Sequence, residues 1–374
     1  MRIAIAAETR SGERRVALVP GLVSRLTGAG FEVAVEPGAG AAAHHPDDDY
    51  RAAGAEVTPD AARGAAALLG VQPPTGAQLD ALAKNAVVIS FLAPAEELDL
   101  VAHLRDASLS AFSMELVPRT SRAQSMDALS SQALVAGYRC ALVAAERLPR
   151  FFPLLMTAAG TVAPARVLVL GAGVAGLQAI ATARRLGAVV RAYDVRTAAA
   201  EEVRSVGAEF VDLGLPPLEG AGGYARQMTE ERAARQLELL APHVAEADAL
   251  ITTAAVPGRR APLLVTAEMV AAMRPGSIVV DLAAEQGGNV EGAVAGEEIG
   301  VGGVRVWGGR NVPSQMPAQA SQLYAANVVN LLLHMASDGS VVPDLNDDIV
   351  SGSCVTHDGE VHHEPTRELL ARRS

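Results

Sequence analysis

Length, composition and charge restrict what this chain can be. Its 374 residues, 50% of them hydrophobic and 20% charged, can bury substantial cores and favour two domains over one. A formal net charge of −11 offers no basic surface for a phosphate backbone, so nucleic acid is not an expected partner. The only cysteines, Cys140 and Cys354, lie far apart without metal-ligand spacing, which argues against a disulfide framework.

Apolar segments of the chain are short or interrupted. The N-terminal apolar stretch is much shorter than the core of a signal peptide, and we interpret it as a first strand. The two most apolar segments, around Leu142 and Leu331, are interrupted by Glu146, Arg147 and His334. We therefore expect that the chain does not span a membrane by itself.

The N-terminal third alternates short apolar strands with helical patterns. Pro20 opens a helical pattern that runs to Gly28 or Gly30. Strands are expected within residues 2–7, 31–35, 86–92 and 108–114. Such alternation is typical of a parallel sheet covered by helices.

A second α/β series follows a long helical pattern at residues 131–148, which combines good helix formers with apolar positions on one face. We interpret this helix as the bridge between two domains. Strands of the second series are expected at 166–170, 189–194, 208–211, 249–253 and 277–281. A helical pattern from about Gln319 to Met335 is expected to return to the first domain.

The predicted fold class is α/β, with two Rossmann-like domains that have parallel sheets. Residues 1–130 plus 318–374 form the first predicted domain, and residues 131–317 form the second. The Gly- and Pro-rich residues 214–223 are expected to form a mobile surface loop. Polar residues from Asp338 onward are expected to form a short hairpin or a loose extension.

The sharpest motif is a glycine-rich turn in the sequence VLVLGAGVAGLQAI, where a predicted strand runs through Gly171, Gly173 and Gly176 into a helix. In a dinucleotide-binding turn the first glycine permits the tight bend, and the second lets the backbone approach a pyrophosphate. The third lets the helix pack on the sheet. The helix N-terminus offers N–H groups and a positive dipole end to the diphosphate. This complete context favours nucleotide binding over a purely structural turn.

Asp194 ends the next predicted strand, eighteen residues after Gly176. An acidic side chain there can accept hydrogen bonds from the adenosine ribose hydroxyls. Because its carboxylate would repel a 2′-phosphate, NAD(H) is preferred over NADP(H). Arg196 could contact a phosphate, but we interpret it as a solvated side chain.

The segment VPRTSRAQSMDALSSQA concentrates hydrogen-bonding side chains just before the predicted bridging helix. They are Arg119, Arg122, Gln124, Ser125, Asp127, Ser130 and Ser131. Such density suits a loop that contacts a ligand. A solvated loop whose Asp127 or Ser130 caps the helix explains it equally well. Residue chemistry alone therefore leaves both interpretations open.

The chain resembles the first domain of proton-translocating transhydrogenases in RTSRAQSMDALSSQ, GAGVAGLQAIATARRLGA, RAYDVR, GGYA, ITTAAVPG and DLAAEQGGN. The resemblance covers nearly all of the chain. It implies an NAD(H)-binding alpha subunit that binds NAD(H) in the cleft of two domains and passes hydride from NADH to NADP+ on a partner domain. It also implies a homodimer and separate NADP(H)-binding and membrane-spanning subunits, which couple transfer to proton translocation. The chain would then be cytoplasmic and held peripherally at the inner face of the cell membrane.

The resemblance also implies roles for individual residues. Arg119 and Asp127 would hold the carboxamide of NAD(H), Gln124 would reach toward NADP(H), and Ser130 would support the same site. Tyr224 matches a tyrosine on a mobile loop that closes over the nucleotide, and a half-buried loop anchor is its alternative interpretation. Further implied nucleotide contacts are Gly171, Ala172, Gly173, Val174, Ala175, Gly176, Asp194, Val195, Arg196, Gly223, Gln236 and Ala255.

An alanine dehydrogenase is the alternative function, because the start of the chain resembles that family too. Amino-acid oxidation moves a proton from the amine and adds water to an imine, so it needs a general acid or base. At the positions of that family's lysine and histidine this chain has Gln72 and Ala93, which cannot carry a proton near neutral pH. Hydride transfer between two nicotinamides needs only positioning and exclusion of water. A third candidate, a noncatalytic NAD-sensing module, would have no use for the loop of Arg119, Gln124 and Asp127.

Two further pairs of polar residues lie outside the motifs described above. His44 and His45 precede an acidic run, but without a paired cluster we expect a solvated turn and no metal. Arg14 and Arg15 in the first loop either position the early strand or face the cleft, and the sequence favours neither.

Overall fold

The computed structural model of this chain describes residues 1–196, 198–216, 229–255 and 260–373. The chain divides into two compact units, Met1–Gln132 with Ser314–Ser374, and Ala133–Pro313. The first division between them falls inside a long helix, α5 (Ala128–Arg147).

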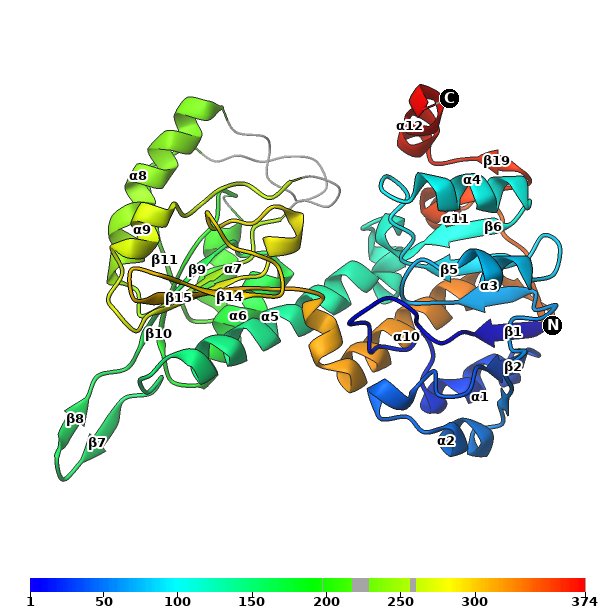
Figure 1. The fold of residues 1–374 in the computed structure, drawn as a ribbon, viewed down its shortest axis with the longest axis horizontal. Coiled ribbons are helices and arrows are strands. Elements are labelled where there is room, and N and C mark those ends of the chain that lie inside the picture. The colour runs from blue at the N-terminus through cyan, green and yellow to red at the C-terminus, as the bar shows by residue number, and fades with distance from the viewer. Residues whose placement is uncertain (197, 217–228, 256–259, 374) are drawn as a thin grey trace. The chain divides into compact units, whose positions relative to one another are not determined.

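An eight-stranded sheet forms the centre of the first unit, with the strand order β19-β18-β6-β5-β4-β1-β2-β3 (Figure 1). The six strands from β3 to β6 are parallel, and β18 and β19 complete the sheet in antiparallel fashion. The strands are β1 Arg2–Ile5, β2 Glu32–Val35, β3 Glu56–Val57, β4 Ala67–Leu69, β5 Val87–Ser90, β6 Ser110–Ser113, β18 Cys354–His357 and β19 Glu360–Val361.

Both faces of this sheet are buried. Successive side chains of a strand point to opposite faces, so neighbouring residues of one strand pack in different apolar clusters. Ile3 and Ile5 of β1 share one apolar cluster with residues of α1 and α10, whereas Ala4 between them shares another with α3 and α4. A sheet covered on both faces explains the nearly continuous apolar runs of its strands. The helices are α1 Pro20–Gly28, α2 Asp47–Ala52, α3 Gly76–Asp80, α4 Leu98–Asp106, α10 Pro317–His334, α11 Asp348–Ser353 and α12 Glu364–Arg373, with 3-10 turns η1 Ala41–Ala43, η2 Met114–Leu116 and η3 Ser121–Met126.

The second unit has a seven-stranded sheet with the order β11-β10-β9-β12-β13-β15-β14, parallel except for β14. The chain leaves β9 toward β10 and β11, and then crosses back to continue through β12 and β13. In such sheets ligands bind outside the carboxyl ends of the strands where the order reverses, here between β9 and β12. The strands are β9 Arg166–Leu170, β10 Val189–Tyr193, β11 Glu209–Phe210, β12 Ala249–Thr252, β13 Ile278–Asp281, β14 Glu298–Val301 and β15 Val304–Gly308.

Helices and short elements complete the second unit. Figure 1 shows a separate hairpin, β7 with β8, that extends away from the seven-stranded sheet. The elements are α6 Val174–Arg185, α7 Ala199–Ser205, α8 Glu230–Glu246, α9 Ala267–Ala271, η5 Ala284–Gln286, β7 Leu155–Thr157 and β8 Gly160–Val162. The 3-10 turn η6 Val312–Gln315 crosses the second division between the units, and the short strands β16 Ala336–Ser337 and β17 Ser340–Val341 belong to the first unit.

The predicted α/β class with parallel sheets is confirmed. The helix predicted from Pro20 and the strand predicted at 166–170 have the expected bounds. The bridging helix predicted at 131–148 begins earlier, at Ala128.

Of the two expected forms of the C-terminal tail, the hairpin is present as β18 and β19, and the loose extension is not. β18 adds to the first sheet beside β6, and helices α11 and α12 flank the hairpin. Val355 is fully buried, and it packs in the cluster that contains Val88 of β5. Local periodicity could not reveal this, because most apolar partners of Val355 lie more than 200 residues earlier in the sequence.

Among the described residues, one helix, α5, is long and apolar enough to cross a membrane by length and composition alone. Half of its most apolar window is buried within the protein. Cys140, Ala141 and Ala144 of this helix pack into the apolar cluster of the second unit that also contains residues of β9. Core helices of globular domains have the same length and composition, so α5 is weak evidence for a membrane span.

Candidate nucleotide-binding turn and polar loop

The three glycines after β9 meet three different local demands. Gly171 has a φ of +97°, in the left-handed region that glycine adopts without strain. A Cβ on Gly176 would lie 1.9 Å from the carbonyl oxygen of Gly171, so only glycine fits there. A Cβ on Gly173 would meet nothing within 4 Å. The protein therefore leaves open the space at the glycine whose backbone would face a pyrophosphate.

No side chain of α6 itself competes with an anion at its N-terminus. Gly173 is its N-cap, no side chain caps the helix, and the first turn holds no acidic residue. N–H groups of the first turn lack helical partners, and the helix dipole is positive at this end. Ala172 and Ala175 are buried, whereas Val174 is exposed beside these N–H groups. These features fit the diphosphate of a dinucleotide.

Asp194 follows β10 at the edge of the glycine turn. Its carboxylate accepts a hydrogen bond of 2.7 Å from the backbone N–H of Ala172. It also accepts from the Arg196 Nε at 2.9 Å, and this ion pair raises the pKa of Arg196. The interpretation of Arg196 as a solvated side chain is therefore wrong, because the carboxylate two residues before it holds its guanidinium. Val195 between them is half-buried.

The remaining predicted contacts of this unit lie in different surroundings. Gln236 of α8 is buried and accepts a hydrogen bond of 3.1 Å from the Tyr193 hydroxyl, so it supports the strand that leads to Asp194. Ala255 is exposed after β12. Gly223 and Tyr224, with most of the predicted mobile loop, lie outside the described residues.

The polar loop of the first unit ends in a helix cap. Both carboxylate oxygens of Asp127 are engaged by Ser130, one by its N–H at 2.8 Å and the other by its hydroxyl at 2.6 Å. This is the helix cap that the sequence allows as one interpretation of the segment. Arg119 and Gln124 are exposed earlier in the same loop. The cap fixes Asp127 relative to α5 and leaves those two side chains on the surface of the unit.

Helices α10 and α11 of the C-terminal segment hold this loop through hydrogen bonds. The sequence did not predict these contacts. The carbonyl oxygen of Ser125 accepts hydrogen bonds of 2.9 Å from the side-chain amides of both Asn327 and Asn330 on α10. Arg122 donates to Asp347, the N-cap of α11, at 2.7 Å. No local pattern links residues about 200 positions apart, so only the folded chain identifies them.

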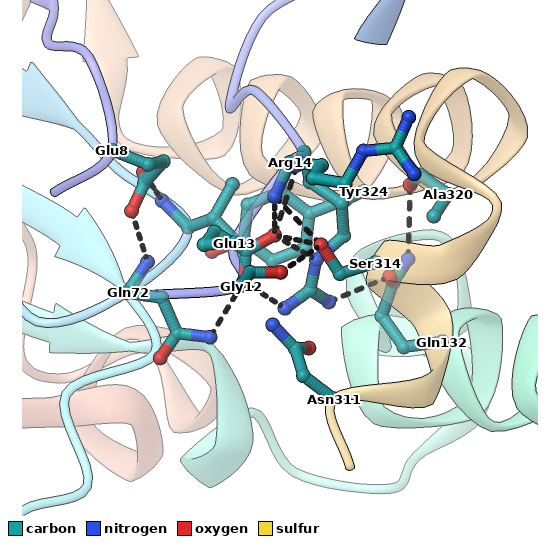
Figure 2. Close-up of polar contacts among 12 residues, drawn as sticks. Glu8, Gly12, Glu13, Arg14, Gln72, Gln132, Asn311, Ser314, Ala320 and Tyr324 are labelled. Carbon is teal, nitrogen blue, oxygen red and sulfur yellow. Dashed lines mark hydrogen bonds and ion pairs between the residues drawn. The ribbon is translucent and has the colours of Figure 1, made fainter. Parts of the chain in front are cut away.

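Figure 2 shows a buried polar network around the first loop of the chain. Arg15 is 4% exposed and pairs with Glu13 at 2.7 Å, while its Nη1 donates to Gln132 at 2.9 Å. The backbone N–H of Arg14 donates to Ser314 at 2.6 Å. Arg15 therefore belongs to the interior of the first unit and positions its early segment.

The same network explains two unusual carboxyl groups. Burial raises the pKa of Glu8 to about 7, although the N–H groups of Val71 and Gln72 donate to its carboxylate. Burial acts in the same direction on Glu13, but hydrogen bonds and the charge of Arg15 prevail and lower its pKa to about 2. One of two neighbouring carboxyls is thus held ionised and the other near its titration point at neutral pH.

The two positions that distinguish an alanine dehydrogenase hold inert side chains. Gln72 donates from its Nε2 to Glu13 at 2.8 Å, so its amide serves the buried network. Ala93 has only a methyl group, and its backbone N–H donates to Glu115 at 2.6 Å. Among the described residues, no group of three or more His, Cys, Asp or Glu side chains could hold a metal ion.

Family models account for nearly the whole chain. The model of the alanine dehydrogenase/PNT N-terminal domain matches residues 4–136, and that of the C-terminal domain matches residues 140–364. The chain belongs to the alanine dehydrogenase/PNT family. The glycine turn lies within the C-terminal domain of this family, and the polar loop lies within the N-terminal domain.

Within the alanine dehydrogenase/PNT family the chain is more similar to transhydrogenase proteins. An NAD(P) transhydrogenase alpha-subunit protein of Rhodospirillum rubrum is 47% identical, with 97% of this chain and 98% of the relative covered. The structure of transhydrogenase from Sinorhizobium meliloti matches with a TM-score of 0.88 at 46% identity, covering 96% of this chain and all of the other. Alanine dehydrogenase of Mycobacterium tuberculosis is 34% identical, with 78% and 75% covered. The chain is therefore a homologue of NAD(P) transhydrogenase alpha subunits.

Proposed function

We propose that this chain is the NAD(H)-binding alpha subunit of a proton-translocating NAD(P) transhydrogenase. The observation that carries the proposal is the glycine turn. Gly173, with open space where a side chain would be, precedes a helix N-terminus without a side-chain cap, and Asp194 directly follows the next strand. Similarity to NAD(P) transhydrogenase alpha subunits supports transfer between nicotinamides over other NAD-dependent reactions.

In this proposal the second unit holds the dinucleotide. Its diphosphate is bound by N–H groups of the turn that contains Gly171, Ala172, Gly173, Val174, Ala175 and Gly176. Asp194 accepts hydrogen bonds from the adenosine ribose, with Val195 and Arg196 beside it. Further contacts are assigned to Gly223, Tyr224, Gln236 and Ala255. Bound NADH supplies the hydride.

The polar loop of the first unit is assigned the transfer step. Arg119 and Asp127 hold the nicotinamide carboxamide, Gln124 reaches toward NADP(H) on the partner, and Ser130 supports Asp127. The two hydrogen bonds between Ser130 and Asp127 hold that carboxylate in one orientation before any ligand binds. Hydride transfer between two nicotinamides releases no proton at the reacting carbon, so the loop has to position its ligands and exclude water.

The alternative of amino-acid oxidation is disfavoured by the same chemistry. It needs a side chain that can take up and release a proton near the substrate. Gln72 cannot ionise and is engaged by Glu13, and Ala93 carries no polar atom in its side chain.

A homodimer is part of the proposal, and the β7–β8 hairpin supports it. Met156 is 81% exposed, and Leu154 and Phe151 beside it are more than half exposed. Two strands alone are marginally stable in water, and exposed apolar side chains gathered on one element mark an interaction surface. A second copy of the chain is the partner that we assign to this hairpin.

The proposal also includes partners of a different kind. NADP(H) is bound by a separate subunit, and membrane-spanning subunits carry the proton. The chain itself acts at the cytoplasmic face of the cell membrane, where these partners hold it peripherally. The naming of its relatives as alpha subunits supports an assembly of several subunits.

The decisive experiment mixes the purified chain with a purified NADP(H)-binding transhydrogenase domain and measures hydride transfer from NADH to an absorbance-shifted NADP+ analogue. Rapid transfer that needs both proteins is the expected result. Alanine-dependent reduction of NAD+ by the chain alone serves as the control reaction. Alanine oxidation without transfer would overturn the proposal.

Gln124→Ala separates an enzyme from an NAD-sensing module. We expect this variant to bind NADH with the affinity of the wild type and to lose most of its hydride transfer, because Gln124 is assigned to the partner's nucleotide. Gln322→Ala, on an exposed face of α10, is the matched control. Wild-type transfer by Gln124→Ala would remove this residue from the mechanism.

A further inference from the structure

Asn289 joins the two ends of a loop that begins beside the glycine turn. This residue is fully buried in the segment after β13. Its Oδ1 accepts a hydrogen bond of 3.0 Å from the N–H of Ala254, and its Nδ2 donates to the carbonyl oxygen of Ala254 at 2.8 Å. The same Nδ2 donates to the carbonyl oxygen of Pro262, also at 2.8 Å. Every hydrogen-bonding group of the side-chain amide except one acceptor lone pair is thus used by Ala254 and Pro262.

Asp281 holds Asn289 in place. It is fully buried at the end of β13, and its Oδ2 accepts from the N–H groups of Asn289 at 2.9 Å and Val290 at 3.0 Å. Its Oδ1 accepts from the Thr252 hydroxyl at 3.0 Å, at the end of β12. The Asp281 carboxylate therefore links Asn289 to β12, the strand that precedes Ala254.

Thr253 and Ala254, which follow β12, lie against the glycine turn that we propose to bind the pyrophosphate. The hydroxyl of Thr253 donates to the carbonyl oxygen of Gly171 at 3.0 Å. A Cβ on Gly171 would lie 2.9 Å from the N–H nitrogen of Ala254, so the two backbones are in direct contact. This contact lies between β9 and β12, where the strand order reverses. Any displacement of Ala254 therefore changes the surroundings of the turn.

We propose that Asn289 is a positioning residue of the nucleotide site, which holds Ala254 against the glycine turn by joining it to Pro262, while Asp281 holds Asn289 in place. The inference rests on the proposed NAD(H) function. Asn289 touches no reacting atom. It acts through Ala254 and the exposed Ala255, which the glycine turn and Asn289 together hold beside the diphosphate-binding N–H groups.

The test replaces the amide with a carboxylate of nearly the same shape. In Asn289→Asp an oxygen would face the carbonyl oxygens of Ala254 and Pro262, so these two groups would be repelled instead of bonded. We expect the Kd for NADH, measured by NADH fluorescence with the full chain, to rise roughly tenfold or more. In the transfer assay we expect KM for NADH to rise with it, while kcat at saturating NADH stays within about threefold of the wild type.

A matched control and a milder variant keep the test decisive. Gln286→Glu makes the same amide-to-carboxylate change on an exposed side chain of the preceding turn, and it should leave the Kd for NADH unchanged. Thr253→Val removes only the hydrogen bond to Gly171 and should raise the Kd in the same direction by a smaller factor. It decides the question if Asn289→Asp does not fold.

The outcomes separate this inference from the function on which it rests. A folded Asn289→Asp that binds NADH like the wild type would overturn the positioning role of Asn289. A fall in kcat at an unchanged KM would overturn it as well, because the residue would then act on the chemical step. A wild-type chain that binds no NADH would instead refute the proposed function.

Discussion

Asp194 and Arg196 are the residues that we propose to set the preference for NAD(H). The carboxylate lies between the Ala172 N–H and the guanidinium, so the arginine is neutralised by its neighbour. A carboxylate in this place accepts hydrogen bonds from ribose hydroxyls and disfavours a 2′-phosphate. The Arg196 guanidinium, which could otherwise bind such a phosphate, is paired with Asp194 instead.

Asp194→Ala should therefore weaken NADH and favour NADPH. The variant loses hydrogen bonds to a charged group, which corresponds to roughly a tenfold or greater rise in the Kd for NADH. It also removes the carboxylate that pairs with Arg196, so the ratio of the Kd for NADPH to the Kd for NADH should fall. Fluorescence titration of both reduced nucleotides measures the ratio. An unchanged ratio would show that Asp194 does not face the ribose.

Glu8 should give the first unit a measurable pH dependence. Its pKa is raised from 4.5 to about 7, so the folded protein holds the proton more tightly than the unfolded chain does. The stability associated with this group is present below pH 4.5 and is lost as pH rises to about 7. Its neighbour Glu13, with a pKa of about 2, stays ionised and paired with Arg15 throughout this window.

Glu8→Gln cannot ionise and should lack that loss. The free energy of unfolding of the variant relative to wild type should rise between pH 5 and pH 8, by at most roughly 3 kcal/mol. Denaturant unfolding at several pH values provides the measurement. Parallel pH profiles of the two proteins would contradict a near-neutral titration of Glu8.

At the scale of elements, α5 and α6 pack so closely that only glycine fits between them. A Cβ on Gly137 of α5 would lie 2.0 Å from the carbonyl oxygen of Ala175 on α6. Contact of this kind fixes the start of α6, where the diphosphate is proposed to bind. The packing of α5 therefore affects the position of the glycine turn at the start of α6.

Gly137→Ala should destabilise the second unit by roughly 1–3 kcal/mol, because an overpacked backbone contact has to move apart. Gly21→Ala in α1 is the control, since its added methyl group meets nothing within 4 Å. That change should leave the stability unaltered or raise it by up to about 1 kcal/mol. Urea unfolding of both variants gives the comparison, and equal stabilities would refute the packing argument.

The C-terminal segment shows how distant elements complete a local site. α10 supplies the two asparagine amides that hold Ser125, and the N-cap of α11 binds Arg122. The polar loop is therefore fixed by residues that follow the entire nucleotide-binding unit in the sequence. Its orientation depends on the return of the chain to the first unit.

At the scale of the whole molecule, the β7–β8 hairpin is proposed to join two copies. Met156→Asp places a charge on its most exposed apolar position and should shift the chain from dimer to monomer at micromolar concentration. Sedimentation velocity measures the shift. Val342→Asp, at an exposed apolar residue of the first unit, should remain dimeric. A Met156→Asp variant that stays dimeric would exclude the hairpin as the interface.

Much of the architecture was predictable because it follows local patterns. Apolar runs indicated β1, β2, β5 and β6 of the first sheet and β9 to β13 of the second, whereas β3, β4, β14 and β15 were not predicted. The glycine spacing indicated the turn after β9. The predicted division at 130/131 compares with a boundary at Gln132/Ala133. A hairpin in the tail after Asp338 was predicted, but its addition to the first sheet was not, because Val355 finds its apolar partners only after the chain has returned to that sheet.

The sequence by itself determined the α/β class, the glycine turn and the family, because each depends on residues close together in the chain or on identity along its length. Only the tertiary structure decided that Arg196 pairs with Asp194, that Arg15 lies in a buried network, and that Asn289 joins Ala254 to Pro262. These contacts depend on which carboxylates, amides and carbonyls the packed sheets bring within about 3 Å, and a side chain buried among them has to find its hydrogen-bond partners there.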